Sequence, residues 1–166
     1  YRSLAAPRTV ADDDIKAKVA ALTAGKTSDE EKIRALYAYV ATQVRYIGVA
    51  FGIGRYQPHL AGDVLNNQYG DCKDKHTLLA AMLSAAGIQA NAALIGANVR
   101  FNPDVPSPAA FNHVITMIPL STGAVWLDAT EEGAPYRAMI SILRDKNALV
   151  IPASGDAQIE KTPAAL

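Results

Sequence analysis

The chain has 166 residues, of which 50% are hydrophobic and 19% are charged, and its 16 lysines and arginines balance its 16 aspartates and glutamates. This composition is typical of a globular protein, and the length fits a single domain over residues 1–166. The balanced charge gives no sign of a nucleic-acid-binding surface, which requires an excess of cations. The one cysteine excludes an internal disulfide and a zinc cluster built on several thiolates.

The sequence shows neither the pattern of a membrane-spanning segment nor that of a targeting segment. No apolar stretch approaches the ~20 residues that a membrane-spanning helix requires. Tyr1 begins a polar segment without the pattern of a signal peptide. Because the chain lacks a starting methionine, we expect a mature product or a domain excised from a longer protein.

The first part of the chain is predicted to be mainly helical. Residues 1–8 are expected to form a tail, followed by a helix from Thr9 to about Ala24 with acidic residues in its first turn. A capping box over residues 28–31 precedes apolar residues spaced three or four apart, which predicts an amphipathic helix ending near Arg45. Residues 46–69 lose this periodicity and predict an irregular connection with one helical turn at 61–65.

A central helix is predicted from Cys72 to about Ala86, capped by Gly70 or Asp71 and ended by Gly87. Later segments that are rich in apolar and β-branched residues predict strands at 88–95, 113–119, 124–128 and 148–151. A turn at 121–123 makes a hairpin of 113–119 and 124–128, and a proline-rich surface loop is expected at 98–110. Helices first and an antiparallel sheet later predict an α+β fold.

Cys72 is the most informative residue, because it opens the central helix. A cysteine reacts as the thiolate, and the helix dipole and the unpaired N–H groups of a first turn favour that anion. The same N–H groups can hold a developing oxyanion, so the N–H of Cys72 itself is the expected donor. Gln43, Tyr46 and Tyr56 are open alternatives for a second donor. Lys73 and Lys75, beside the thiol, are expected to be solvated.

His113 and Asp128 are predicted to complete the site. His113 opens one strand of the hairpin and Asp128 closes the other, so the hairpin brings the two side chains together. A carboxylate there can bind one ring nitrogen while the other faces the Cys72 sulfur. Trp126 is expected to be a core or under-site aromatic.

Two alternatives involve His76, which follows Cys72 by four residues on the same helix. It could act as the base in place of His113, although a role in the wall of the pocket is favoured because no orienting acid is in range. Cys72, His76 and His113 could also bind a metal ion together with Asp74 or Asp128, although no spacing in the sequence demands it. His59 is expected in a loop, solvated or at the rim of the cleft.

Several motifs together resemble those of the transglutaminase-like superfamily, specifically the bacterial domains that accompany an amino-terminal domain of unknown function. The resemblance covers about residues 28–130. It rests on Val44-Arg45-Tyr46, Tyr56-Gln57-Pro58-His59, Tyr69-Gly70-Asp71-Cys72-Lys73-Asp74-Lys75, Leu78-Leu79, Ala86-Gly87-Ile88, Asn112-His113 and Trp126-Leu127-Asp128-Ala129-Thr130.

The resemblance implies a papain-like α+β core, in which the helix opened by the nucleophile packs on an antiparallel sheet. It places Cys72, His113 and Asp128 on the triad positions, and implies amide hydrolysis or transfer through a thioester, without a cofactor or metal. The sequence departs from the family at His76, where a small or apolar residue is expected, and at Ala129, where proline is usual. It also lacks the oxyanion tryptophan and the calcium-binding carboxylates of animal cross-linking enzymes.

We therefore expect a cysteine-dependent acyl-transfer enzyme, acting as a peptidase, an amidase or a transglutaminase-like transferase. The expected partner is a peptide or protein substrate, with further domains of the same polypeptide, and the chain is expected to be a monomer. The resemblance favours a periplasmic or extracellular location. Two alternatives stay open: a non-catalytic peptide-binding module of a larger envelope protein, and an arylamine-type acetyltransferase.

Overall fold

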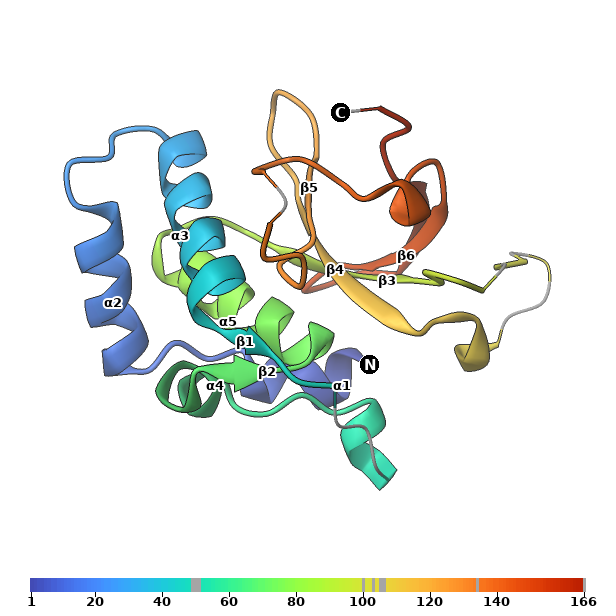
Figure 1. Cartoon of the computed structure of the whole chain (residues 1–166), viewed down its shortest axis with the longest axis horizontal. Helices are drawn as coiled ribbons and strands as arrows, with labels where there is room; N and C mark the ends of the chain where they lie inside the picture. Colours follow the sequence, from blue (N-terminus) through green and yellow to red (C-terminus); the bar gives the residue numbers. More distant parts are fainter. Residues whose placement is uncertain (49–51, 100, 103, 105–106, 134, 166) are drawn as a thin grey trace.

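Helices gather on one side of the molecule and a sheet on the other (Figure 1). The structure, a computed structural model, describes residues 1–48, 52–99, 101–102, 104, 107–133 and 135–165. The α-helices are α1 (Arg2–Ala5), α2 (Asp13–Thr23), α3 (Asp29–Gln43), α4 (Ala61–Asn67) and α5 (Cys72–Ala85). Short 3-10 turns are η1 (Ala6–Arg8), η2 (Gly52–Arg55), η3 (Pro108–Ala110) and η4 (Ser141–Leu143).

Two sheets are present in the described part of the chain. The small one pairs β1 (Arg45–Tyr46) with β2 (Tyr69–Gly70) in parallel. The large one has the order β5-β4-β3-β6-β7 and is antiparallel throughout. Its strands are β3 (Asn91–Ile95), β4 (His113–Ile118), β5 (Val125–Leu127), β6 (Asn147–Ile151) and β7 (Gln158–Lys161). The predicted α+β class and the predicted hairpin, now β4 and β5, are confirmed.

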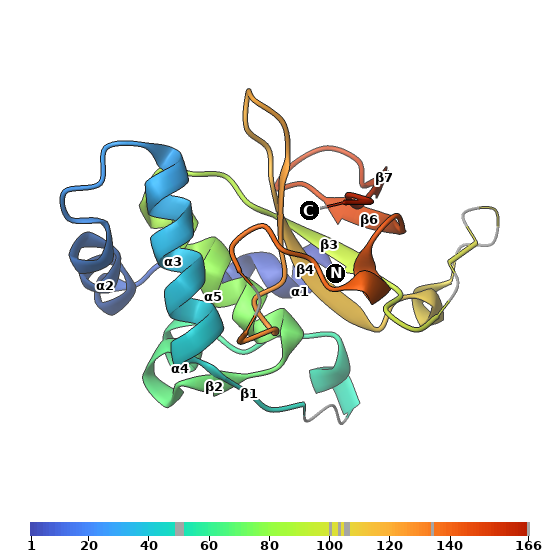
Figure 2. The ribbon, with the colours of Figure 1, turned by 45° about the horizontal axis from the view of Figure 1, so that its top comes forward.

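Helix α5 lies between α3 and β4 and forms the centre of the fold (Figure 2). Every residue from Lys73 to Leu83 is buried. One hydrophobic core joins α2, α3, α4 and α5 to the face of the sheet that carries Ile118 and Leu127. A second core covers the opposite face, where Trp126 packs with residues of the C-terminal segment. Trp126 is therefore a core residue, as expected.

The N-terminal residues differ from the expected tail. Residues 2–8 form α1 and η1, and Ala5 is buried. Pro7 stands near the start of η1, where its missing N–H costs nothing. The segment is too short for a helical period to be visible in its sequence, and its position depends on contacts with residues far along the chain.

Three strands were not predicted from the sequence. Strands β1 and β2 have two residues each, too few to show alternation, and the segment between them contains α4. Strand β7 is largely exposed at the edge of the sheet, and Ile159 is its one apolar residue. The predicted loop at 98–110 lies partly outside the described residues, and its described end forms η3.

Candidate active site

Cys72 is the first residue of α5 and is half-buried. Asp71 caps the helix, and its carboxylate accepts hydrogen bonds from the backbone N–H groups of Lys73 and Asp74. Strand β2 leads directly into this cap and is fixed by β1, since the N–H of Ile47 donates to the Gly70 carbonyl at 3.0 Å. The N-terminus of α5 is therefore held on both sides of the thiol.

His113 and Asp128 meet at the end of the β4–β5 hairpin, as the sequence predicts. The distance from His113 Nε2 to Asp128 Oδ2 is 2.8 Å, and the Asp128 side chain is only 2% exposed. The other carboxylate oxygen, Oδ1, accepts from the backbone N–H of Thr130 at 3.0 Å and from its hydroxyl at 2.7 Å. Thr130 therefore orients the carboxylate, a role that the sequence analysis did not assign.

Cys72 also interacts electrostatically with the imidazole of His113. Burial alone would lower the pKa of His113, but hydrogen bonding to Asp128 and to Cys72, together with their negative charges, raises it to about 10. Because Asp128 binds Nε2, the second ring nitrogen, Nδ1, is the one that Asp128 does not occupy. Burial would raise the pKa of Asp128, but its hydrogen bonds to His113 and Thr130 hold it below its usual value.

His76 is placed differently from His113. It is buried, its Nδ1 lies 2.8 Å from the Thr116 hydroxyl on β4, and burial lowers its pKa to about 4. It lines a hollow beside Ser84 and Ala92, separate from the one that Cys72 lines. Within the described residues, no group of three or more His, Cys, Asp or Glu side chains is arranged to hold a metal ion.

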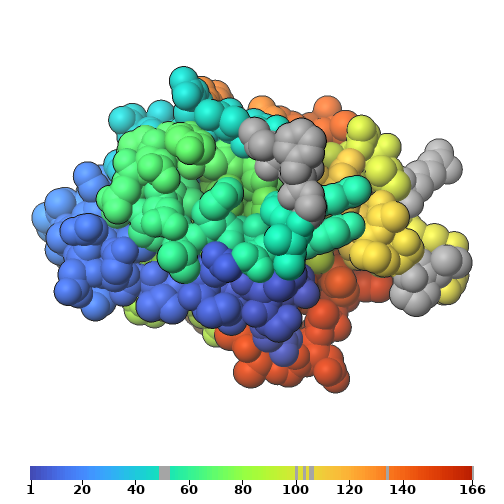
Figure 3. Space-filling model, turned by 90° about the horizontal axis from the view of Figure 1, so that it is seen from below, coloured from blue at the N-terminus to red at the C-terminus, as the bar shows by residue number. Residues whose placement is uncertain are grey.

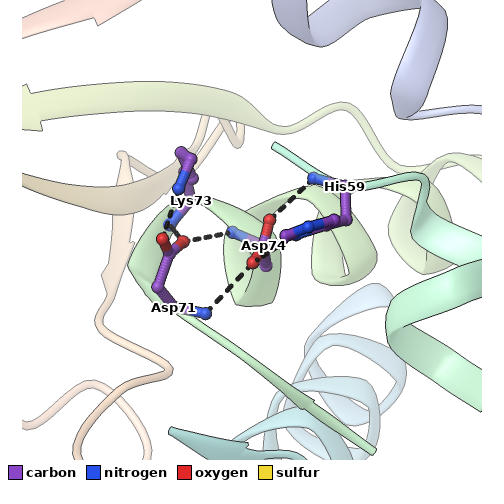
Figure 4. Close-up of polar contacts among 4 residues, drawn as sticks. All are labelled: His59, Asp71, Lys73 and Asp74. Carbon is purple, nitrogen blue, oxygen red and sulfur yellow. Dashed lines mark hydrogen bonds and ion pairs between the residues drawn. The ribbon is translucent and has the colours of Figure 1, made fainter. Parts of the chain in front are cut away.

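The residues around Cys72 form a buried polar scaffold (Figure 4). Asp71 pairs with the Lys73 ammonium, and both residues are buried. Asp74 completes a capping box with Asp71 and also binds His59, whose backbone N–H lies 2.8 Å and whose Nδ1 lies 3.0 Å from its carboxylate oxygens. Asp74 thus joins the start of α5 to the segment that precedes α4. His59 keeps an exposed side chain, 70% accessible.

The expectation that Lys73 and Lys75 are solvated is wrong. Lys75 is fully buried, and its ammonium donates to the carbonyls of Ala41 at 3.2 Å and Val44 at 2.6 Å, at the end of α3. Burial lowers the pKa of Lys75. These partners lie far from the motif in sequence, so the pattern around Cys72 could not reveal them. Gly70 belongs to the same scaffold, because a Cβ there would lie 2.6 Å from the Asp74 Cβ.

Replacing Asp71 by alanine tests this scaffold. The variant loses a helix cap and leaves the buried Lys73 ammonium without its carboxylate, so we expect the free energy of unfolding to fall by about 3–5 kcal/mol. Asp12 caps α2 in the same way, through the N–H of Ile15 at 2.9 Å, but it is exposed. Asp12→Ala is the matched control and should cost about 1 kcal/mol. If urea denaturation gave equal losses of unfolding free energy for Asp71→Ala and Asp12→Ala, the stabilising role of the buried Asp71–Lys73 pair would be contradicted.

Cys72 and His113 open into a cleft of about 1130 Å³. The N-terminal segment, the segment of η2, the segment leading into β4 and the last strands converge on this face of the molecule (Figure 3). Tyr46 and Tyr56 both line the cleft, whereas Gln43 is exposed and bonds to Thr42. Tyr1 also lines it, with a buried hydroxyl that has no hydrogen-bond partner in the described structure.

Residues 16–128, more than half of the chain, match the family described as the transglutaminase-like superfamily. The chain belongs to this superfamily. The central helix, the sheet and the hairpin described above are its papain-like core, as the resemblance implied. No curated protein matches the sequence.

Two solved structures share the fold of this transglutaminase-like chain. One, from Parabacteroides distasonis, is described as a "putative protease"; it has a TM-score of 0.71 and 17% identity, over 99% of this chain and 30% of its own. The other, from Cytophaga hutchinsonii, is described as a "putative cysteine protease"; it has a TM-score of 0.54 and 17% identity, over 76% of this chain and 42% of its own. The chain thus spans less than half the length of either protein.

Among the described residues of this transglutaminase-like chain, no helix combines the length and the apolar character needed to cross a bilayer.

Proposed function

We propose that this transglutaminase-like domain is a cysteine-dependent acyl-transfer enzyme that acts on amide or peptide bonds, with Cys72 as nucleophile, His113 as base and Asp128 as orienting group. The observation that carries the proposal is that the imidazole of His113 interacts with both Asp128 and Cys72. The distance from His113 to Asp128 is 2.8 Å, Cys72 lines the same cleft as His113, and both Asp128 and Cys72 raise the pKa of the imidazole. This is the arrangement that an activated thiol requires.

The reaction proceeds in two stages. The Cys72 thiolate attacks the carbonyl carbon, a C–S bond forms, and the carbonyl oxygen becomes an oxyanion. When the oxyanion collapses, the C–N bond breaks and His113 gives its proton to the departing amine, leaving a thioester. Neutral His113 then takes a proton from water or an acceptor amine, which attacks the thioester and expels the thiolate. No cofactor is needed for either stage.

The oxyanion requires hydrogen-bond donors beside the sulfur. The amides of Lys73 and Asp74 are bound by Asp71, which favours the N–H of Cys72 as the backbone donor. The hydroxyls of Tyr1 and Tyr46 are the candidates for a second donor. For each, burial first and the negative charge of Cys72 next raise the pKa, so that the hydroxyl keeps its proton.

Hydrolysis is the proposed outcome, and transfer to an amine is the second candidate. The support for hydrolysis is that both proteins of similar fold are described as "putative" proteases. Transfer uses the same thioester and differs only in the acceptor, so the three catalytic side chains do not distinguish the two outcomes.

The test is turnover of a peptide library in H₂¹⁸O, with products identified by mass spectrometry and with methylamine added in a parallel reaction. Hydrolysis places ¹⁸O in a new carboxyl group, whereas transfer gives an N-methylamide. Acetylation of an arylamine by a coenzyme A thioester, with no peptide turnover, would support the acetyltransferase alternative instead. Absence of any turnover, with Cys72 alkylated by iodoacetamide no faster than a model thiol, would support the binding-module alternative.

A further inference from the structure

Part of the sheet beyond the start of α5 carries an unbroken apolar row. Leu94 on β3 lies directly opposite Val114 on β4 and, on its other side, opposite Leu149 on β6. Leu149 in turn lies opposite Ile159 on β7. These residues therefore form one row across adjacent strands, here called the apolar shelf: Val114, Leu94, Leu149 and Ile159.

The apolar shelf is continuous with the candidate active site. Val114 follows His113 in β4, and all members of the shelf line the same cleft as Cys72 and His113. Exposure increases along the row away from His113. Val114 is 9% exposed, Leu94 and Leu149 are half-buried, and Ile159 is 46% exposed. The shelf is thus an apolar surface that lines the same cleft as the His113 imidazole and is most accessible at Ile159.

Most of the side chains that line the cleft together with the shelf are apolar or aromatic. Among the described lining residues, Asp71 and Lys73 pair with each other, and Arg55 is placed over the ring of Tyr56 at 5.6 Å. Tyr46, Phe101 and Phe111 add aromatic rings to the other walls. Covering such a surface with an apolar group releases water and is favourable in proportion to the area buried.

We propose that the apolar shelf binds a bulky apolar side chain, aromatic or branched, on the acyl part of the substrate. The proposal rests on the proposed function, because it takes the thiol beside the shelf as the nucleophile. It names the substrate class as peptides with a large apolar residue on the amino-terminal side of the bond attacked. The shelf then sets specificity, while Cys72 and His113 carry out the chemistry.

Dipeptidyl chloromethyl ketones test the proposal without knowledge of the leaving group. Such a reagent alkylates the sulfur, so that a C–S bond forms and chloride leaves. One residue at a time is varied among phenylalanine, leucine, glycine and aspartate, and the rate of Cys72 labelling is followed by mass spectrometry. At one of the two positions, phenylalanine or leucine should label about 10- to 100-fold faster than glycine or aspartate.

Two variants test whether the apolar shelf is the source of this preference for phenylalanine or leucine. Ile159→Asp should reduce this preference, measured as the ratio of the labelling rates of the phenylalanine or leucine reagent to that of the glycine reagent on the same variant, by about tenfold. Ile142→Asp is the matched control, because Ile142 is 44% exposed in η4, does not line the cleft, and should keep the full preference. Equal rates for all side chains, or a preference unchanged by Ile159→Asp, would overturn the proposal alone. Labelling of Cys72 by every reagent no faster than of free cysteine would overturn the proposed function itself.

Discussion

Replacing Cys72 by alanine is expected to lower the rate of amide turnover by about 10⁴-fold or more, since the removal of one member of a catalytic triad typically has an effect of this size. The sulfur is the atom that bonds to the substrate, and no second cysteine exists in the chain to replace it. Turnover is measured as product release from a peptide that the parent cleaves. Cys72→Ser should be nearly as inactive, because the hydroxyl is a much weaker nucleophile at neutral pH.

The fold should survive this change, which makes the loss of activity interpretable. Cys72 is half-buried at the first position of α5, where alanine fits a helix well, and the cap comes from Asp71. We expect the urea midpoint of Cys72→Ala to stay close to that of the parent. Turnover by Cys72→Ala equal to that of the parent, in a folded protein, would rule out Cys72 as the nucleophile.

The second large effect concerns His113 and its charge. We expect the His113 imidazolium of the parent to persist through neutral pH and to titrate at a pKa of about 10 rather than near 6.5. Asp128→Asn keeps a hydrogen-bond acceptor but removes the negative charge, so the pKa of His113 should fall. Turnover should fall as well, by about 10²- to 10⁴-fold, the range associated with general acid–base catalysis.

NMR titration of the imidazole protons in the parent and in Asp128→Asn measures this shift. Glu131→Gln is a suitable control, because it removes a carboxylate close to Asp128 in sequence that makes no hydrogen bond to His113 in the described structure. A parental His113 that titrates near 6.5, unchanged in Asp128→Asn, would contradict the ion pair.

The same pair predicts how stability depends on pH. The pKa of His113 is higher in the folded than in the unfolded state, so its contribution is complete below pH 6.5 and is lost as the pH rises toward about 10. The pKa of Asp128 is lower in the folded state, so its contribution is present above pH 3.8 and is lost on further acidification. Urea denaturation of His113→Gln should lack the alkaline part of this dependence.

The sequence predicted the parts of the structure that local patterns specify. The capping box at Ser28 defined the start of α3, and Gly87, with φ of +78°, ended α5 as expected. The turn at 121–123 brought Thr116 opposite Leu127, which placed His113 near Asp128. In each case the residues that determine the element lie within it or beside it in the chain.

The parts that were missed depend on contacts between distant segments. Lys75 is buried because the end of α3 offers it two carbonyls, and nothing near the motif indicates this. Thr130 orients Asp128 only once the hairpin has formed. Strands β6 and β3 lie between β7 and β4 in the sheet, and this order is what brings Ile159 on β7 to the cleft that Cys72 lines. That order is not visible in the sequence around either residue.

The buried scaffold also explains why so many charged residues surround one thiol. Asp71, Lys73, Asp74 and Lys75 satisfy one another or nearby backbone groups. They hold the start of α5 in place, and charged groups are retained in a buried position only when they are paired in this way. In the proposed mechanism, catalysis is carried out by Cys72, His113 and Asp128 instead.

The most direct test of the account is mass spectrometry of the protein after rapid acid quenching of its reaction with a cleaved peptide. We predict an adduct with the mass of the acyl part of the substrate, located on Cys72 and removed by hydroxylamine, as expected for a thioester. Product formation without any adduct on Cys72, or an adduct that persists in Cys72→Ala, would contradict the central claim.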